Sequence, residues 1–388
     1  MQPDHFTANA PGQAIHQPTG YWAFIPDPLP PTISWSSELI ALLSAADRAL
    51  GELAGWGYTL PNPRLLTQPF IRREATLSSR IEGTRTSLTD LYAYDAVQLS
   101  LFEFPEDVQE VRNYVQALEY GLARLAELPV SLRLIRELHA QLLTGIRGDH
   151  WTPGEFRRSQ NWIGRAGCTL STAVLVPPSV EAMHTALDQL EKFIHAPSQL
   201  PPLVRLAIIH YQFEVIHPFL DGNGRVGRLL ISLLLADWRL LPQPLLYLSA
   251  YFEANRPAYY ERLLAISQRG EWEAWLIYFL EGVRSQADDG THRIRRLQTL
   301  QAMYREQFQT ARAAARLLQA VDCLFEQPIF TVTWLSDKLG VNYPTAQRYV
   351  QQLEKEGIVR EITGQARNRV YRAEAILQAI EMDQAADA

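Results

Sequence analysis

Cysteine is nearly absent from this 388-residue sequence, which contains only Cys168 and Cys323. Two cysteines so far apart exclude a disulfide framework and a cysteine-rich zinc cluster, and they favour a reducing compartment. Long apolar runs are also missing, because the strongest, 229–236, is far shorter than the roughly 20 residues that cross a bilayer. Residues 1–12 lack the basic start and apolar core of a signal peptide. We therefore expect a cytoplasmic protein without a membrane partner.

Neither sign of charge dominates the sequence. Its 36 Lys and Arg residues stand against 42 Asp and Glu residues, which gives a net charge of −6 at pH 7. This balance excludes a whole-chain attraction to nucleic acid or to an anionic membrane, so any nucleic-acid site has to be local. The hydrophobic content of 47% and the charged content of 20% are typical of a folded globular protein. At about 100 to 200 residues per domain, the length predicts two or three domains.

Helical periodicity dominates the sequence from Ser37 onward, and we predict a mostly α-helical protein. Interleaved apolar residues and glycines at 152–178 predict one β-hairpin in the helical core. The predicted helices span 106–128, 131–145, 180–194, 203–216, 225–238, 256–268 and 271–285, with a break at 288–291 before a long helix at 292–325. The predicted domains are an extended N-terminal arm at 1–34, an N-terminal helical region at 35–100, a catalytic core at 101–288, a connecting helix at 289–322 and a C-terminal module at 323–388.

The C-terminal module resembles a winged helix-turn-helix, with a turn at Gly340 between two helices and a wing formed by strands at 358–361 and 370–372. Residues 327–372 carry seven basic and four acidic side chains, a net charge of +3. If the module binds DNA, we expect these residues to contact it: Thr345, Gln347, Arg348, Arg367 and Arg369. Protein docking or dimerisation is an equally weighted alternative.

The chemically informative segment is 217–228, with the sequence HPFLDGNGRVGR. Pro218 prevents the preceding apolar helix from continuing, so His217 should lie at a helix end beside a loop. The glycine-containing loop runs into a new helix, and a helix N-terminus after such a loop is suited to bind an anion. Arg225 and Arg228 lie on one side of the first turn of this helix. Two guanidinium groups at an anion-binding loop indicate a polyphosphate.

Two further side chains in this segment suggest chemistry. Asp221 supplies one carboxylate, the usual protein share of a Mg²⁺ site whose other ligands are phosphate and water. His217 is the one group there able to accept a proton near neutral pH. Rival motifs fail on spacing, because a P-loop needs Lys and Ser or Thr where Arg228 and Leu229 stand. A calcium loop would need a metal ligand in place of Arg225.

Residues 217–228 match without a gap the H-P-F-x-[D/E]-G-N-G-R-x-x-R signature of Fic domains, which transfer a nucleotide monophosphate to a protein hydroxyl. The segments 154–157, 162–164 and 176–178 are similar to the flap hairpin of that family. Residues 251–256 with 259–260 are similar to its nucleotide-base side. The resemblance covers roughly residues 35–285.

The resemblance implies a role for each matching position. His217 would be the general base that deprotonates a target Ser, Thr or Tyr hydroxyl, and Asp221 would hold Mg²⁺ on the α- and β-phosphates of ATP. The implied phosphate-binding residues are Gly222, Asn223, Gly224, Arg225 and Arg228. The implied base-side residues are Tyr251, Asn255 and Tyr259, although packing in the core is an alternative for Tyr259 and is our expectation for His210.

Residues 78–83, with the sequence SSRIEG, match the [S/T]-x-x-x-E-[G/N] inhibitory motif of many Fic proteins, with Ser78, Glu82 and Gly83 at its fixed positions. The apolar pattern predicts a helix that Gly83 terminates, which leaves Glu82 at the negative end of the helix dipole. The resemblance implies that Glu82 pairs with Arg228 and displaces the terminal phosphate of ATP. In the alternative, Ser79 and Glu82 form a capping box that starts a helix.

We therefore predict a protein adenylyltransferase that transfers AMP from ATP to a protein hydroxyl and is inhibited by Glu82. The expected partners are ATP with Mg²⁺ and a protein substrate, which can be the chain itself. DNA and a second copy of the chain are further candidate partners. Two other functions stay open: removal of AMP from a modified protein, with Glu82 orienting the attacking water, and DNA-binding regulation by a chain whose Fic core senses nucleotide.

Overall fold

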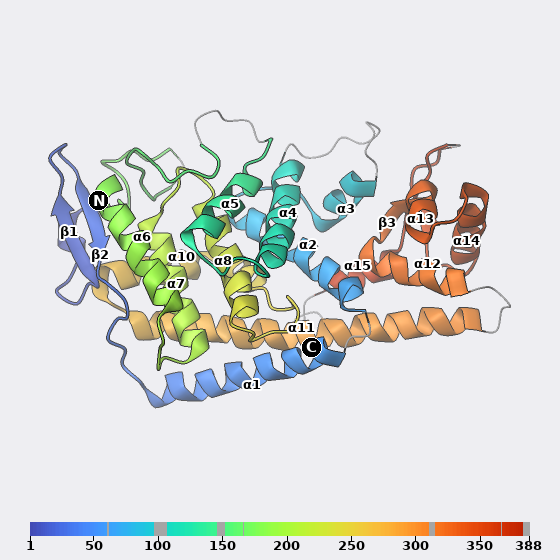
Figure 1. Ribbon diagram of the computed structural model, residues 1–388, viewed down its shortest axis with the longest axis horizontal. Coiled ribbons are helices and arrows are strands. Elements are labelled where there is room, and N and C mark those ends of the chain that lie inside the picture. Colours follow the sequence, from blue (N-terminus) through green and yellow to red (C-terminus); the bar gives the residue numbers. More distant parts are fainter. Residues whose placement is uncertain are drawn as a thin grey trace. The chain divides into compact units, whose positions relative to one another are not determined.

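The computed structural model describes residues 1–59, 62–96, 107–145, 152–165, 167–309, 315–365 and 367–382 (Figure 1). The chain forms two compact units, and each unit combines segments far apart in the sequence. The first unit contains Met1–Gly51, Gln116–Leu240 and Leu248–Gln286, and the second contains Glu52–Val115, Leu241–Tyr247 and Ala287–Ala388. Within the described ranges, no helix combines the length and the apolar character needed to span a bilayer.

The first unit is mainly helical, as the sequence predicts. Its own elements are η1 (Pro3–His5), β1 (Gly12–His16), β2 (Trp22–Pro26), α5 (Leu132–Leu142), α6 (Val180–His195), α7 (Pro202–Ile216), α8 (Asn223–Asp237), α9 (Ser249–Ala254) and α10 (Arg256–Arg269). Three further helices contribute residues to both units: α1 (Ser37–Thr59), α4 (Val108–Arg124) and α11 (Trp272–Gln309). Serine side chains start two of these helices, because Ser131 and Ser179 accept hydrogen bonds from the N–H groups of Leu134 and Ala182.

Helices α7 and α8 form the centre of the first unit. Helix α7 packs against α6 and α8, and α5 packs against α8. Almost every residue of α7 and α8 is buried, which explains why both helices are apolar on all sides and lack a polar face. The loop that joins them, residues 217–222, is therefore held at both ends by the best-packed part of the unit.

The predicted extended arm at 1–34 contains a β-hairpin that the sequence analysis missed. Strands β1 and β2 pair antiparallel, with Gly12 opposite Pro26 and His16 opposite Trp22 (Figure 1). Strand β2 packs against α7. Phe24 is fully buried, which gives this short hairpin an anchor in the unit. The glycines and prolines of residues 1–34 predicted an extended arm without pairing. Most of these residues lie before, between or after the two strands, where they do not disturb the pairing.

Helix α11 corrects the predicted break at 288–291, because it runs without interruption over Trp272–Gln309. Asp289 accepts a hydrogen bond of 2.7 Å from Arg293, one turn later on the same helix, so this aspartate supports the helix at the predicted break. Gly290 allows close packing, since a Cβ there would lie 3.2 Å from a methyl carbon of Leu53. Of the long helix predicted at 292–325, residues 310–314 lie outside the described residues.

The second unit joins the N-terminal helical region to the C-terminal module. Its own elements are α2 (Pro63–Ile81), α3 (Leu88–Ala96), α12 (Ala315–Glu326), β3 (Ile329–Thr331), α13 (Val332–Leu339), α14 (Tyr343–Lys355), β4 (Arg360–Glu361), β5 (Val370–Arg372) and α15 (Glu374–Glu381). The three strands form an antiparallel sheet in the order β3-β5-β4. Helix α2 packs against α12 and α15, and α3 packs against β3 (Figure 1). The domain boundary predicted near residue 100 lies outside the described residues.

The order of helices and strands predicted for the C-terminal module is confirmed. Gly340 ends α13 with a left-handed conformation, at φ 61°, that favours glycine. The Asn342 side chain then starts α14 by accepting a 3.0 Å hydrogen bond from the Thr345 N–H group. Strands β4 and β5 form the predicted hairpin. Gln327 ties the module to α3 by donating to the carbonyl oxygen of Tyr92 at 3.0 Å.

Candidate functional site

His217 occupies a strained position at the end of α7. Its backbone is left-handed, at φ 49° and ψ 61°, and its N–H group donates to the Phe213 carbonyl oxygen at 3.1 Å. For a residue other than glycine, this conformation costs roughly 1–2 kcal/mol. Pro218 follows and cannot continue the helix, so the chain leaves α7 at this histidine as predicted.

One ring nitrogen of His217, Nδ1, is hydrogen-bonded to the main chain of the preceding helix α7. Nδ1 lies 3.1 Å from the carbonyl oxygen of Glu214. A carbonyl oxygen only accepts hydrogen bonds, so Nδ1 carries the proton when the imidazole is neutral. The lone pair is then on Nε2, and the ring has the tautomer that a general base requires.

The side chain of Asn223 closes the loop on itself. Its Oδ1 accepts from the N–H group of Phe219 at 2.8 Å, and its Nδ2 donates to the carbonyl oxygen of Phe219 at 2.9 Å. Both ends of the amide are thus engaged in shaping the loop. The phosphate contact predicted for Asn223 stays a prediction, and it would come from the main-chain N–H group in the first turn of α8.

The first turn of α8 collects the predicted anion-binding groups. Gly222 precedes the helix at φ 78°, a left-handed conformation that favours glycine. The N–H groups of the first turn have no acceptor within the helix, and the helix dipole makes this end positive. Arg225 lies in this turn and Arg228 in the next one, and they are 4% and 2% exposed. A 15-residue helix with two buried guanidinium groups at its N-terminus can bind a polyphosphate.

Asp221 is accessible enough to meet a bound cation. Its side chain is 40% exposed, and one carboxylate oxygen accepts a 2.9 Å hydrogen bond from Arg225. Within the described residues, no cluster of three or more His, Cys, Asp or Glu side chains could enclose a metal ion. A single exposed carboxylate beside a phosphate site is the arrangement that Mg²⁺ commonly uses, so Asp221 fits the predicted metal role.

His139 in α5 belongs to the site, and the sequence analysis missed it. Its Nδ1 accepts from the Gly154 N–H group at 2.9 Å, so Nε2 carries the proton and donates to the Asp221 carbonyl oxygen at 3.1 Å. The ring stacks on Phe219 with centroids 3.7 Å apart. Burial lowers the pKa of His139 to about 4, so the ring is neutral at physiological pH. No local motif marks it, because its partners lie 15 and 82 residues away in the sequence.

The flap, residues 154–178, is more irregular than the predicted β-hairpin. Its two arms are linked by one antiparallel bridge, between Ile163 and Leu175. The N-terminal hairpin supports it, because the Phe24 N–H group of β2 donates to the Val176 carbonyl oxygen at 2.8 Å. Tyr21 adds a 3.0 Å hydrogen bond to Gln160. The flap is therefore held from the side by strand β2.

The predicted base-side residues divide into buried and exposed ones. Tyr259 is 1% exposed, and its hydroxyl lies 2.8 Å from Nε2 of His210. Burial lowers the pKa of His210 to about 3, so this is a neutral packed histidine, as expected. The burial of Tyr259 favours its packing role over a base contact. Asn255 is exposed, and its amide donates to the Tyr251 carbonyl oxygen at 2.9 Å.

The residues of the predicted inhibitory motif end α2 in the second unit. Ser78 is fully buried, Glu82 is exposed at the C-cap, and Gly83 follows at φ 105°. The predicted helix end is thus confirmed. The alternative capping box is wrong, because Ser79 lies in the last turn of α2 and cannot start a helix. The carboxylate of Glu82 lies at the negative end of the helix dipole.

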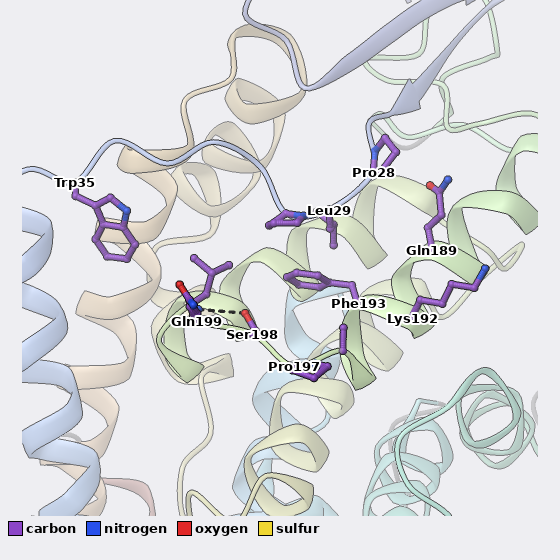
Figure 2. A pocket seen from close by; sticks show the side chains of 12 residues that line it. Pro28, Leu29, Trp35, Gln189, Lys192, Phe193, Pro197, Ser198 and Gln199 are labelled. Atoms are coloured by element: carbon purple, nitrogen blue, oxygen red, sulfur yellow. Dashed lines mark hydrogen bonds between the residues drawn. The ribbon is translucent and has the colours of Figure 1, made fainter.

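A groove of about 650 Å³ lies elsewhere in the first unit, between residues 28–35 and the end of α6 (Figure 2). Prolines and apolar side chains make up most of its wall, including Pro28, Trp35 and Phe193. Lys192 is the one charged side chain among its lining residues. The groove contains none of the residues of the histidine loop, so it is not a candidate for phosphate chemistry.

A helical core with a histidine-bearing loop that leads into an arginine-rich helix N-terminus defines a Fic-type fold. Residues 40–123 match the family described as Fic/DOC family N-terminal, and residues 129–235 match the Fic/DOC family. Residues 129–235 are therefore assigned to a Fic/DOC domain, preceded by the N-terminal region of that family, as the motif at 217–228 predicts.

Curated proteins similar to part of this chain are named as protein adenylyltransferases. A protein from Drosophila virilis named protein adenylyltransferase Fic is 33% identical over 133 residues, which are 34% of this chain and 25% of that protein. The corresponding protein of Drosophila willistoni is 32% identical over 133 residues, 34% of this chain and 24% of its own length. The match thus spans about a quarter of the length of these curated relatives.

Solved structures show the same fold at low sequence identity. A Fic family protein from Desulfovibrio desulfuricans has a TM-score of 0.55 at 20% identity, with 89% of this chain and 98% of that chain covered. A Fic domain containing signaling protein from Bacteroides thetaiotaomicron has a TM-score of 0.50 at 18% identity, with coverage of 66% and 95%. These likenesses establish the Fic fold.

Proposed function

We propose that the protein transfers AMP from ATP to a Ser, Thr or Tyr hydroxyl of a protein. The observation that carries this proposal is the fixed tautomer of His217 beside an anion-binding helix N-terminus, with Nδ1–H held by the Glu214 carbonyl oxygen at 3.1 Å. The lone pair on Nε2 can accept the proton of an incoming hydroxyl. The names of the curated relatives support the same reaction.

The reaction assigns a role to each group of the loop. The hydroxyl oxygen attacks the α-phosphorus of ATP, its proton passes to Nε2 of His217, and the bond to the β-phosphate oxygen breaks to release pyrophosphate. The N–H groups of the first turn of α8 would bind phosphate oxygens, and Arg225 and Arg228 would neutralise the phosphate chain. Asp221 would hold Mg²⁺, which supplies further charge neutralisation when bound.

We also propose that Glu82 inhibits this activity, by the likeness of residues 78–83 to the inhibitory motif. In the family that carboxylate binds the second arginine of the signature, which here is Arg228. Removal of AMP from a modified protein is the closest alternative reaction, in which Glu82 would orient a water molecule. A cytoplasmic location suits the transfer reaction, because ATP is the donor, and both cysteines are free thiols.

Mass spectrometry provides the test. Lysate proteins and the chain itself are incubated with ATP and Mg²⁺, and modified peptides are mapped. We expect adenylylated hydroxyl side chains in reactions with the wild-type protein and none with a His217→Ala control. Absence of adenylylated peptides in every reaction, including one with a Glu82→Gly variant, would refute the transfer proposal.

DNA binding by the C-terminal module is a second candidate function. Arg348 on α14 and Arg367 and Arg369 on the wing are all exposed, so three cations lie on the two parts that a winged helix presents to DNA. Gln347 and Thr345 on the same helix are half-buried and could read base edges only with their exposed atoms. Dimerisation or protein docking through this surface remains the competing use.

We expect Arg348→Ala with Arg369→Ala to weaken binding to a pool of genomic fragments and to reduce the dependence of log K on log salt by about two units. These substitutions are preferable to deletion of 323–388, because α15 packs against α2 and its loss would expose that helix. The control is Arg133→Ala with Arg158→Ala, which removes two exposed cations from the first unit. If the wild-type protein retains no DNA at low salt, the docking alternative is favoured.

A further inference from the structure

Arg157 at the base of the flap is a buried cation whose partners are all main-chain carbonyl groups. It is 1% exposed. Its Nε donates to the His217 carbonyl oxygen at 3.0 Å, its Nη1 to that of Ser159 at 3.2 Å, and its Nη2 to that of Pro178. Among the described residues, no carboxylate forms an ion pair with it. Burial lowers the pKa of Arg157 to about 10, which leaves the group charged at neutral pH.

Burying a guanidinium group without a carboxylate partner carries a large desolvation penalty. The groups that this side chain contacts therefore indicate what it is needed for. Ser159 lies in the first arm of the flap, and Pro178 lies at its end, where the chain leaves it. The third partner is the carbonyl group of His217, the proposed base. One side chain thus connects both arms of the flap to the residue that is proposed to accept the proton.

A neighbouring side chain strengthens the same connection. Asn161 donates from Nδ2 to the carbonyl oxygens of His217 at 3.0 Å and of Phe219 at 2.8 Å. The main chain runs alongside, because the Arg157 N–H group donates to the Pro218 carbonyl oxygen at 2.9 Å. The His217 carbonyl therefore accepts from two buried flap donors, while the ring of the same residue is fixed by the end of α7. These bonds hold the left-handed backbone of His217.

We propose that Arg157 is a positioning residue for the transfer reaction: it holds the main chain of His217 where the ring can reach the Glu214 carbonyl group that fixes its tautomer. This inference rests on the proposed function, in which Nε2 of His217 must lie within hydrogen-bonding distance of the incoming hydroxyl. Only a planar guanidinium can donate to three separate carbonyl groups in fixed directions, so lysine cannot replace it. The proposed phosphate-binding groups are the N–H groups of the first turn of α8 with Arg225 and Arg228. None of the bonds of Arg157 reaches them, so ATP binding should not depend on Arg157.

The primary test compares Arg157→Lys with Arg158→Lys, a control at the adjacent position. Arg158 has a side chain that is 84% exposed and pairs with Glu155, and it makes no bond to the histidine loop. We expect Arg157→Lys to lower kcat for protein modification by about 10²-fold, the order of loss that a misplacement of about 1 Å produces. The Kd for ATP should change by less than about twofold, a difference well below 1.4 kcal/mol. The control should retain wild-type kcat and Kd.

A spectroscopic readout tests positioning without turnover. The ¹⁵N signals of the His217 ring in the wild-type protein should show protonation at Nδ1, and Arg157→Lys should show a mixture of tautomers. If Arg157→Lys folds and keeps wild-type kcat, or keeps a pure Nδ1–H tautomer, the proposal is overturned. If that variant does not fold, Asn161→Ala decides: a kcat about tenfold lower with unchanged ATP affinity supports the proposal, and an unchanged kcat overturns it.

Failure of the proposed function leaves a different pattern. In that case the wild-type protein modifies nothing. The proposed role of Arg157 is then tested only by comparing the ¹⁵N signals of the His217 ring in Arg157→Lys with those in the wild-type protein. A change of tautomer would then support positioning by Arg157, and identical spectra would overturn it.

Discussion

Replacing His217 with alanine is expected to abolish protein modification while ATP binding is retained. General-base catalysis contributes about 10²- to 10⁴-fold, so the loss should have at least that order. ATP binding persists because the base acts on the incoming hydroxyl, whereas the donor is held by the first turn of α8 and by Arg225 and Arg228. Calorimetry measures ATP binding, and a labelling gel measures transfer.

The matched control for this substitution is His195→Ala, which removes an exposed histidine at the end of α6. It should leave both ATP binding and transfer unchanged. Undiminished labelling by His217→Ala would remove this histidine from the mechanism. Loss of ATP binding together with transfer would instead indicate that the loop between α7 and α8 has collapsed.

Replacing Glu82 with glycine is expected to raise AMP transfer. In the proposed inhibition Arg228 serves either Glu82 or the terminal phosphate of ATP, and it cannot serve both in a bidentate way. An intramolecular carboxylate acts at high effective concentration, so the productive pose of ATP is a minor population. If that population is about 1–10%, the variant gains roughly 10- to 100-fold in rate.

The substitution should leave the end of α2 folded, because the main-chain hydrogen bonds there do not involve the carboxylate. The main-chain N–H groups of Glu82 and Gly83 donate to the carbonyl oxygens of Ser79 and Arg80, both at 3.0 Å. Removing a carboxylate from the negative end of a helix also relieves an unfavourable charge interaction. A thermal melt should therefore show a folded variant with one cooperative transition.

The chain offers a close control at the end of α14. Glu356 is the C-cap there, at φ −83° and ψ 3°, and Glu82 has φ −83° and ψ −5° at the end of α2. Both are exposed, and each is followed by a glycine with positive φ. Glu356→Gly makes the same backbone change without touching the motif, so transfer should stay at the wild-type level.

The direction of the effect separates three accounts of Glu82. Self-inhibition predicts faster transfer by Glu82→Gly. A purely structural role predicts a less stable protein with unchanged or lower transfer. An enzyme that removes AMP predicts loss of hydrolysis of a modified protein, so both directions are assayed on one preparation. Unchanged transfer by a folded variant would contradict self-inhibition.

The histidine loop could be predicted from the sequence because its chemistry is local. Pro218 ends one helix, Gly222 provides a left-handed turn, and Arg225 and Arg228 follow in the first two turns of the next helix, all within 217–228. The end of α2 at Glu82 is local in the same way. Signals of this kind depend on neighbours in the chain, and the structure places these residues as the spacing predicts.

The residues that support the loop could not be found in this way, because their partners are remote in sequence. Arg157 and the His217 carbonyl group are 60 residues apart, and His139 and the Asp221 carbonyl group are 82 apart. The residues next to Arg157 and His139 in the sequence form no pattern from which such contacts could be predicted. The N-terminal hairpin was hidden by glycine and proline content, and α11 continues where two aspartates and a glycine suggested a break.

The most direct test of AMP transfer follows the position of the label on ATP. Glu82→Gly is incubated with its own chain and lysate proteins, using ATP labelled at the α-phosphate or at the γ-phosphate. The account predicts that protein acquires the α-label and not the γ-label, and that adding His217→Ala to the same variant removes the signal. Incorporation of the γ-label, or an undiminished α-label in the double variant, would contradict it.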